Sequence, residues 1–220
     1  MVLPQIAHAL AVPMFRLAFR PVVEGRDNIP RRGPLILAAN HLSALDSFAI
    51  PLVAPRSVAF LAKAEYFGVP GVRGWLLRTG LEGMGAVAVP RGAHRAAQAA
   101  LETALDLVAT GRAFGIHPEG TRSRDGRLYR GRTGVAWLAL ASGAPVVPVA
   151  VLGTDKLQPI GARLPRLGRL TVRFGAPLTF GHVDGAAGQA RRAVTDEIMA
   201  AIQQLSGQDT ADSYNAPYRA

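Results

Sequence analysis

Asn40-His41-Leu42-Ser43-Ala44-Leu45-Asp46 directly follows an apolar run, residues 35–39, that we expect to be a buried strand. On one ideal helix His41 and Asp46 would lie roughly 140° apart and could not meet. A contact between them therefore requires His41 on the turn after the strand and Asp46 in the first turn of a helix, with Ser43 as the expected N-cap. Such a turn projects side chains at the carboxyl end of a strand, which predicts an α/β fold with a site at that edge.

The same run also fits a plain capping box, in which Ser43 and Asp46 only close the start of a helix. Capping accounts for these two residues and leaves Asn40 and His41 unexplained. We therefore keep both interpretations for this run: a helix start, and a base oriented by a carboxylate.

A second polar run, His117-Pro118-Glu119-Gly120-Thr121-Arg122-Ser123, follows another short apolar strand, residues 113–116. It places a flexible glycine and a hydroxyl beside Arg122, whose guanidinium fork matches phosphate oxygens. A third run, residues 85–91, reads as a strand that ends in Arg91. A solvated turn and a plain buried strand are the alternative interpretations of these two runs.

Taken in this order, the runs resemble the glycerolipid acyltransferase family, whose members include the 1-acylglycerol-3-phosphate acyltransferases. The family pattern N-H-x-S-x-x-D matches at Asn40, His41, Ser43 and Asp46, and the pattern G-x-[IV]-x-[IV]-x-R matches at Gly85, Val87, Val89 and Arg91. The pattern P-E-G-T-R-S matches at 118–123, V-P-V matches at 147–149, and K-x-E matches at Lys63 and Glu65. The resemblance covers roughly residues 20–180. His117 stands where the family usually has Phe, and Pro90 where an acidic or polar residue is common, so both departures bear on the identity of the acceptor.

The resemblance implies transfer of a fatty acyl group from acyl-CoA or acyl-carrier protein to the hydroxyl of 1-acylglycerol 3-phosphate, giving phosphatidic acid for phospholipid synthesis. With no cysteine and no G-x-S-x-G elbow, a covalent acyl-enzyme is not indicated. His41 is then the expected general base and Asp46 the group that orients it. The expected phosphate-binding residues are Lys63, Arg91, Glu119, Gly120, Thr121 and Arg122, with Asn40 and Ser43 in support.

Other acceptors stay open, namely glycerol 3-phosphate, another lysophospholipid or a glycolipid. A non-catalytic lipid-binding module is the alternative from another class, and the intact His41 and Asp46 argue against it, because a binder needs no oriented base. We expect no cofactor beyond the thioester co-substrate. We also expect no metal site, since the other histidines lack the spacing of metal ligands.

Twenty-five Lys and Arg against fifteen Asp and Glu give the 220-residue chain a formal charge of +10. This charge suits nucleic acid, anionic lipid or an acidic substrate equally well. Between residues 163 and 173 arginines alternate with leucines, and no aromatic side chains are interleaved to stack on bases. We therefore expect an anionic membrane surface as partner and no nucleic acid, with peripheral binding at the cytoplasmic face of the cell membrane. The oligomeric state stays open.

We expect a single α/β domain at residues 21–206, with a mostly parallel central sheet covered by helices. Residues 1–20 form an interfacial amphipathic helical segment or pack against the domain, and residues 207–220 form a polar tail whose last dozen residues are expected to be poorly ordered. The uncharged stretch at 133–154 is broken by Gly143, Pro145 and Pro148, so it predicts a helix and a strand instead of a membrane span. The expected strands are 35–39, 57–61, 86–89, 113–116, 145–152 and 169–174, and the expected helices after the first strand's turn are 71–80, 93–109, 134–142 and 186–205.

Overall fold

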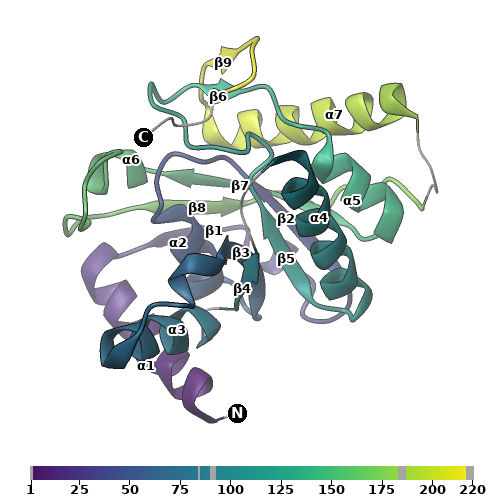
Figure 1. Ribbon diagram of the computed structural model, residues 1–220. Coiled ribbons are helices and arrows are strands. Elements are labelled where there is room, and N and C mark those ends of the chain that lie inside the picture. Colours follow the sequence, from purple (N-terminus) through teal and green to yellow (C-terminus); the bar gives the residue numbers. More distant parts are fainter. Residues whose placement is uncertain (1, 84, 90–92, 183–186, 217–220) are drawn as a thin grey trace.

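The computed structural model describes residues 2–83, 85–89, 93–182 and 187–216 (Figure 1). Within these ranges one sheet has the strand order β1-β8-β7-β2-β5-β3-β4. Only β7 and β8 pair antiparallel, and every other neighbouring pair is parallel, which confirms the mostly parallel sheet. The strands are β1 (Val22–Glu24), β2 (Leu35–Ala39), β3 (Val58–Lys63), β4 (Ala86–Val89), β5 (Ala113–Ile116), β7 (Val146–Leu152) and β8 (Thr171–Phe174).

Helices cover both faces of this sheet (Figure 1). One face packs against α1 (Val2–Phe19) and α2 (Asp46–Val53). The other face packs against α4 (Ala93–Ala109), α5 (Gly134–Ser142) and α7 (Gly188–Ser206). The remaining helical elements are α3 (Gly71–Gly83), which contacts α1, the short α6 (Thr154–Leu157), and the 3-10 turns η1 (Arg26–Asn28) and η2 (Ala64–Tyr66).

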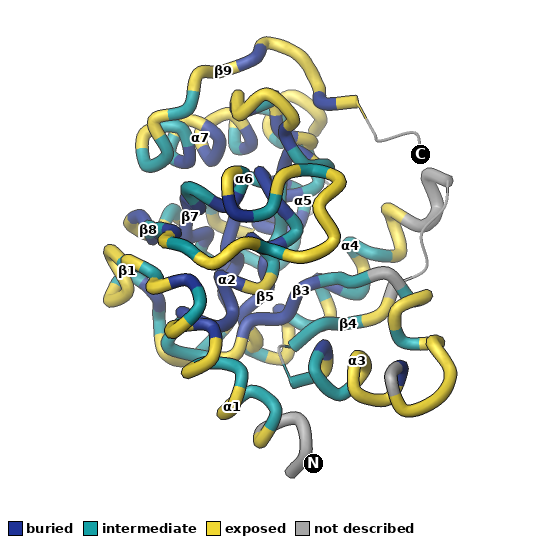
Figure 2. The backbone as a smooth tube through the Cα atoms, turned by 90° about the vertical axis from the view of Figure 1, so that its left-hand side faces the viewer, coloured by how far each residue is buried: buried dark blue, intermediate teal, exposed yellow. Residues whose placement is uncertain are grey.

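Strand β2 shows why its sequence is apolar throughout. Alternate side chains of a strand point to opposite faces, and here both faces are covered. Leu35 and Leu37 lie in the core beside α1 and α2, whereas Ile36 lies in the core beside α4, α5 and α7. Burial of one such side chain contributes roughly 1.5–3 kcal/mol. The buried strands form the dark centre of Figure 2.

Most predicted elements have the expected bounds. The helices at 93–109 and 134–142 and the strands at 35–39, 86–89 and 113–116 are as predicted. β3 extends to Lys63, and β8 begins only at Thr171. Strand β1 was not predicted, because its three residues are too few to show a period.

One local expectation was wrong. Ser43 is not the N-cap of α2, since that helix begins at Asp46 with Leu45 before it. The Ser43 hydroxyl instead accepts the Leu45 N–H and donates to the Gln158 carbonyl, 2.9 Å away. The polar segment after α7 contains a short strand that was not predicted: β9 (Thr210–Ala211) pairs with β6 (Leu128–Tyr129). Residues 217–220 of the expected tail lie outside the described residues.

The N-terminal helix is buried on one side and exposed on another. Phe15 and Phe19 are buried in the core, while Leu10, Met14 and Leu17 are exposed along another face of the helix. None of the helices within the described ranges is long and apolar enough to cross a membrane.

Candidate active site

The predicted site residues gather at one edge of the sheet. His41 follows β2 and His117 follows β5, while Lys63 is the last residue of β3. Because these strands run parallel, their carboxyl ends lie at the same edge. The two conspicuous polar runs of the sequence therefore meet there, although more than seventy residues separate His41 from His117 in the chain.

His41 and Asp46 form the predicted pair. The Nδ1 atom of His41 lies 3.1 Å from Oδ2 of Asp46. A carboxylate oxygen accepts, so Nδ1 carries the ring proton and Nε2 keeps its lone pair. His41 is thereby held in the tautomer that can remove a proton from a substrate hydroxyl.

Three further donors hold the Asp46 carboxylate, which is fully buried. The backbone N–H groups of Leu42 and Ser43 each donate to Oδ2 at 2.7 Å, and the Thr154 hydroxyl donates to Oδ1 at 2.5 Å. Burial raises the pKa of Asp46, and these hydrogen bonds act in the opposite direction. Thr154 was not predicted, although its place just after a buried parallel strand, like that of His41, is the signal that could have found it.

His117 lies against the imidazole of His41. Its ring stacks on the His41 ring with centroids 3.9 Å apart and an angle of 8° between the planes. Nδ1 of His117 lies 3.0 Å from the Asn40 carbonyl, which can only accept, so Nδ1 carries the proton and Nε2 accepts from the Ser47 hydroxyl at 3.1 Å. Burial lowers the pKa of His117 to about 3, so the ring is neutral. Both ring nitrogens of His117 thus form hydrogen bonds within the protein. A Phe at this position, as in the family pattern, would offer a ring beside His41 but neither of these hydrogen bonds.

Glu119 has a different task from the one predicted. Its side chain is buried, and its two oxygens accept the backbone N–H groups of His41 and Tyr129, both at 3.0 Å. Burial raises the pKa of Glu119 to about 7, against the effect of these two hydrogen bonds. The carboxylate therefore fixes the backbone of His41, and its inward direction corrects the expectation that it contacts a phosphate.

The rest of the second polar run forms a tight turn next to His41. The Gly120 N–H donates to the His117 carbonyl at 3.0 Å, and Gly120 has a φ of 76°, a conformation that favours glycine. The Ser123 N–H donates to the His41 carbonyl at 2.7 Å. Arg122 directly precedes Ser123 in the chain, so this hydrogen bond also fixes the backbone beside Arg122. The half-buried Thr121 and Arg122 are thus held beside the His41 loop.

The two residues predicted to support the site, Asn40 and Ser43, form hydrogen bonds with the backbone of other segments. The Asn40 side chain exchanges two hydrogen bonds with Val151 of β7, at 2.7 and 3.0 Å, and also donates to the Gln208 side chain at 2.8 Å. Ser43 donates to Gln158, as described above. Gln208 was not predicted, and no sequence signal marks it.

Two predicted cations are placed less fully. The backbone of Lys63 pairs with that of Val89 where β3 and β4 end, at the edge of the sheet that carries His41. Arg91 and Pro90 lie outside the described residues. Among the residues that are described, no group of three or more His, Asp or Glu side chains is arranged to hold a metal ion.

The chain is similar to known proteins of one family. A family model described as "Acyltransferase" matches residues 20–152. The chloroplastic 1-acyl-sn-glycerol-3-phosphate acyltransferase of Brassica napus is 30% identical over 182 residues, which are 82% of this chain and 51% of the relative. The enzyme of the same name from Borreliella burgdorferi is 31% identical over 152 residues, 66% of this chain and 56% of the relative. This chain therefore spans about half the length of the curated relatives it matches.

The fold also matches a solved structure. The crystal structure of the 1-acyl-sn-glycerophosphate acyltransferase from Thermotoga maritima aligns with a TM-score of 0.67 and 28% identity, covering 92% of this chain and 78% of that one. The alignment covers more of this chain than the family model does, so the likeness continues past residue 152, where that model ends.

Proposed function

The chain belongs to the acyltransferase family, and we propose that it transfers a fatty acyl group from a thioester donor to the hydroxyl of 1-acylglycerol 3-phosphate, giving phosphatidic acid. The observation that carries this proposal is the contact between His41 Nδ1 and Asp46 Oδ2 at the carboxyl edge of the sheet. The names of the relatives support the choice of acceptor. The proposal leaves the donor as acyl-CoA or acyl-carrier protein.

In the proposed reaction, Nε2 of His41 takes the proton of the acceptor hydroxyl as its oxygen attacks the thioester carbonyl carbon. A new C–O bond forms, the C–S bond breaks, and the leaving thiolate takes the proton back from Nε2. Asp46 stabilises the imidazolium that exists between these steps. General-base catalysis of this kind is worth on the order of 10²–10⁴ in rate.

The acceptor phosphate is proposed to bind to Lys63, Arg91 and Arg122, with Thr121 on the same turn. Gly120 gives this turn its shape, since its N–H already donates to the His117 carbonyl. The hydrogen bond between Ser123 and His41 supports this assignment for Arg122, because it keeps the turn and the base together. The position of Lys63 at the end of β3 supports the same assignment. Glu119 is left out of the anion site, since its oxygens already accept two backbone N–H groups.

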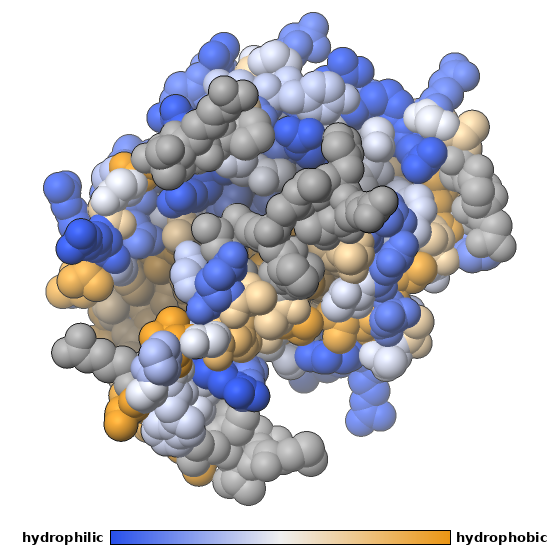
Figure 3. All heavy atoms as spheres, in the orientation of Figure 1, coloured by the Kyte–Doolittle hydropathy of each residue, from blue (hydrophilic) through white to orange (hydrophobic). Residues whose placement is uncertain are grey.

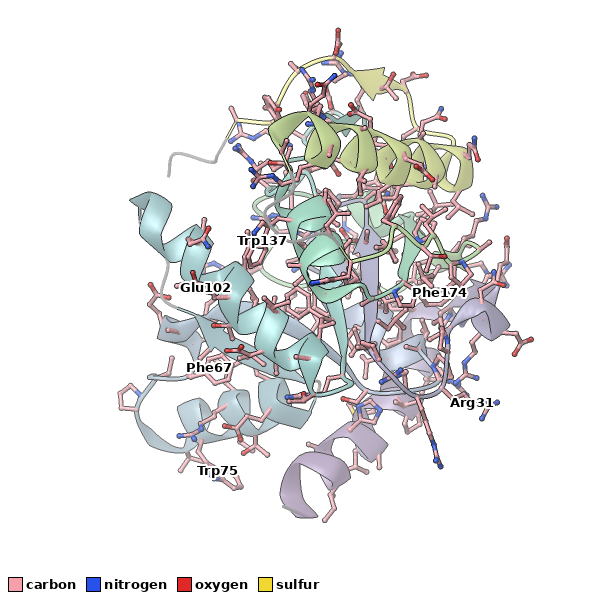
Figure 4. All side chains as sticks on the ribbon, turned by 90° about the vertical axis from the view of Figure 1, so that its right-hand side faces the viewer. Arg31, Phe67, Trp75, Glu102, Trp137 and Phe174 are labelled. Carbon is pink, nitrogen blue, oxygen red and sulfur yellow. The ribbon has the colours of Figure 1, made fainter. Side chains whose placement is uncertain are left out.

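The same proposal includes peripheral binding to an anionic membrane at its cytoplasmic face. Supporting it, exposed apolar side chains lie on two helices that contact each other: Ile6, Leu10, Met14 and Leu17 on α1, and Val72, Trp75, Leu76 and Leu77 on α3. Figure 3 shows apolar side chains among the polar ones on the side of α1 and α3, and Figure 4 shows Trp75 projecting from α3 away from the sheet.

The arginine and leucine segment contributes only in part. Leu164 and Leu167 are exposed, together with Arg163, Arg166 and Arg169. Leu170, by contrast, is buried, and Arg173 binds Glu24 at 2.9 Å, so these two residues belong to the fold and correct the predicted extent of the surface. We name the exposed apolar residues of α1 and α3 together with residues 163–169 the docking surface.

The function is tested with purified protein, a matrix of acceptors and both donors, with release of the donor thiol as the readout. We expect transfer to 1-acylglycerol 3-phosphate, and a loss of at least about 10²-fold in His41→Ala and Asp46→Asn. Asp155→Asn, on neighbouring α6, removes the same charge without touching His41 and is expected to retain activity. Near-normal turnover in His41→Ala would refute the mechanism, and binding without thiol release in the unaltered protein would favour a lipid-binding module.

A further inference from the structure

The segment after α7 lies against the candidate active site. After α7, residues 208–215 run beside the loop that follows β5, where β9 pairs with β6 (Figure 1). Backbone hydrogen bonds fix this course on either side of the pairing: the Leu128 N–H donates to the Asp209 carbonyl at 2.8 Å, and the Arg130 N–H donates to the Ser213 carbonyl at 3.0 Å. This segment lies beyond residue 152, where the match to the family model ends.

Two amide side chains of the segment reach the site. The Gln208 side chain accepts from Asn40 at 2.8 Å and donates to the Gly126 carbonyl at 2.6 Å. Asn215, only 7% exposed, donates to the carbonyls of Arg122 at 3.0 Å and Thr121 at 3.4 Å. The segment therefore contacts both polar runs of the site, through the Asn40 side chain in the first and through the backbone carbonyls of Thr121 and Arg122 in the second.

The contacts of Asn215 are placed to orient one side chain. The Thr121 carbonyl belongs to the peptide plane before the Arg122 Cα, and the Arg122 carbonyl belongs to the plane after it. The N–H of that second plane is the Ser123 N–H, which donates to His41. Asn215 thus holds the peptide plane before Arg122, and Asn215 and His41 together hold the plane after it. With both planes held, the direction in which the Arg122 side chain leaves the backbone is fixed as well.

We propose that Asn215 is a positioning residue for the acceptor site, which aims Arg122 at the phosphate of the acceptor. The inference rests on the proposed function, in which Arg122 binds that phosphate. A side-chain amide suits the task because it donates to carbonyl oxygens, whereas a carboxylate in its place would offer no donor. Because Asn215 is buried, removal of its amide leaves two carbonyls of the turn without this partner.

Steady-state kinetics of Asn215→Ala and Asn215→Asp test the proposal, with Ser213→Ala as the matched control because its backbone carbonyl is retained. We expect the KM for 1-acylglycerol 3-phosphate to rise by roughly tenfold in both Asn215 variants. The kcat at saturation, the KM for the thioester donor and the KM for an acceptor without phosphate, 1-acylglycerol, are expected to change by less than about twofold. Asn215→Ser keeps a short donor and is expected to recover part of the affinity.

A double variant separates positioning from general loosening of the structure. If Asn215 acts through Arg122, then Arg122→Ala with Asn215→Ala binds the phosphorylated acceptor no more weakly than Arg122→Ala alone. Additive losses, equal losses on both acceptors, or an unchanged KM in the Asn215 variants would each overturn the inference. If Arg122→Ala itself leaves the KM for the phosphorylated acceptor unchanged, then the proposed anion site fails, and the role of Asn215 fails with it.

Discussion

The His41 imidazole lies between a carboxylate on one side and a second imidazole stacked on its face. A buried charge such as that of Asp46 is costly unless donors surround it, and here two backbone N–H groups, a hydroxyl and His41 itself do so. The neutral His117 adds no charge to this site. Its hydrogen bonds to the Asn40 carbonyl and the Ser47 hydroxyl fix its ring, and the fixed ring in turn limits how far the His41 imidazole can rotate.

His117→Phe keeps the stacked ring and removes both hydrogen bonds of its nitrogens. At neutral pH we expect the variant to be less stable by about 1–3 kcal/mol, because the Asn40 carbonyl and the Ser47 hydroxyl lose a partner. Folding lowers the pKa of His117 from 6.5 to about 3, so the stability that the neutral ring provides is present above pH 6.5 and is lost as the pH falls toward 3. The difference in unfolding free energy between the two proteins should therefore shrink on acidification, by at most about 1.4 kcal/mol per pH unit.

Chemical denaturation at several pH values measures this difference. Ser47→Ala is the control, since it loses the hydrogen bond to Nε2 and retains the titrating ring, so it should keep the acid sensitivity of the unaltered protein. A difference between the unaltered protein and His117→Phe that does not vary with pH would contradict the argument.

At this scale the sequence predicted the residues whose chemistry is local. His41 and Asp46 lie close together in the chain, so a strand-to-helix turn was enough to bring them into contact. The inward direction of Glu119 was not predictable, because it depends on how the turn packs against the His41 loop. Gln208 and Asn215 belong to a polar segment without periodicity, and their contacts depend on a pairing with β6 more than eighty residues away.

At the level of elements, the turn at 117–123 and the loop after β2 act as one unit, joined by the Ser123 N–H and by Glu119. Short apolar strands and alanine-rich helices gave clear patterns, so their bounds were predicted within a few residues. Strands β1, β6 and β9 have two or three residues each and show no usable period. The anchoring of the chain end, which depends on β6 and β9, could not be read from the sequence for the same reason.

Gly120→Ala tests whether the shape of this turn sets acceptor affinity. A Cβ at Gly120 would lie 2.9 Å from Nε of Arg132, and the φ of 76° is unfavourable for alanine. Gly126→Ala is the matched control, because its φ of 81° is similar while nothing lies within 4 Å of the added atom. Both variants are expected to lose about 1–2 kcal/mol of stability from the strained backbone.

Only Gly120→Ala should also raise the KM for 1-acylglycerol 3-phosphate, because only there must a neighbouring side chain move at the site. Acceptor kinetics and denaturation of the two variants provide the measurement. If both variants show the same kinetics, the geometry of the turn at Gly120 is not what determines acceptor binding.

At the level of the whole molecule, one part of the docking surface, residues 163–169, lies close in the chain to a residue that contacts the active-site loop. The segment at 163–169 lies between the carboxyl end of β7 and the start of β8, and Gln158 just before it binds Ser43. The end of α1 joins the same region, since the Gly168 N–H donates to the Ala18 carbonyl at 3.1 Å. Which apolar residues of α1 and α3 face outward was not predictable from the sequence, because packing decides which side of an apolar helix is covered.

The proposed membrane binding combines apolar insertion with charge. Each basic residue near an anionic surface contributes about 1 kcal/mol, and salt screens this attraction. Flotation with vesicles that contain anionic lipid should therefore weaken at high salt and in the triple variant Arg163→Gln, Arg166→Gln, Arg169→Gln. The same change at Arg31, Arg32 and Arg112 removes equal charge from exposed positions that precede β2 and β5, at the opposite edge of the sheet, and should weaken flotation less.

Apolar insertion is tested by Leu10→Gln with Leu17→Gln, two exposed side chains on α1. Substitution is preferable to deletion of the first fifteen residues, because Phe15 belongs to the core. Each fully inserted leucine contributes roughly 1.5–3 kcal/mol, so flotation should fall sharply while the thermal midpoint is kept. Activity on detergent-dispersed acceptor should also be kept, because His41 and Asp46 are untouched, whereas activity on acceptor in vesicles should fall with binding. Flotation that is insensitive to salt and unchanged by both sets of substitutions would refute this surface as the membrane contact.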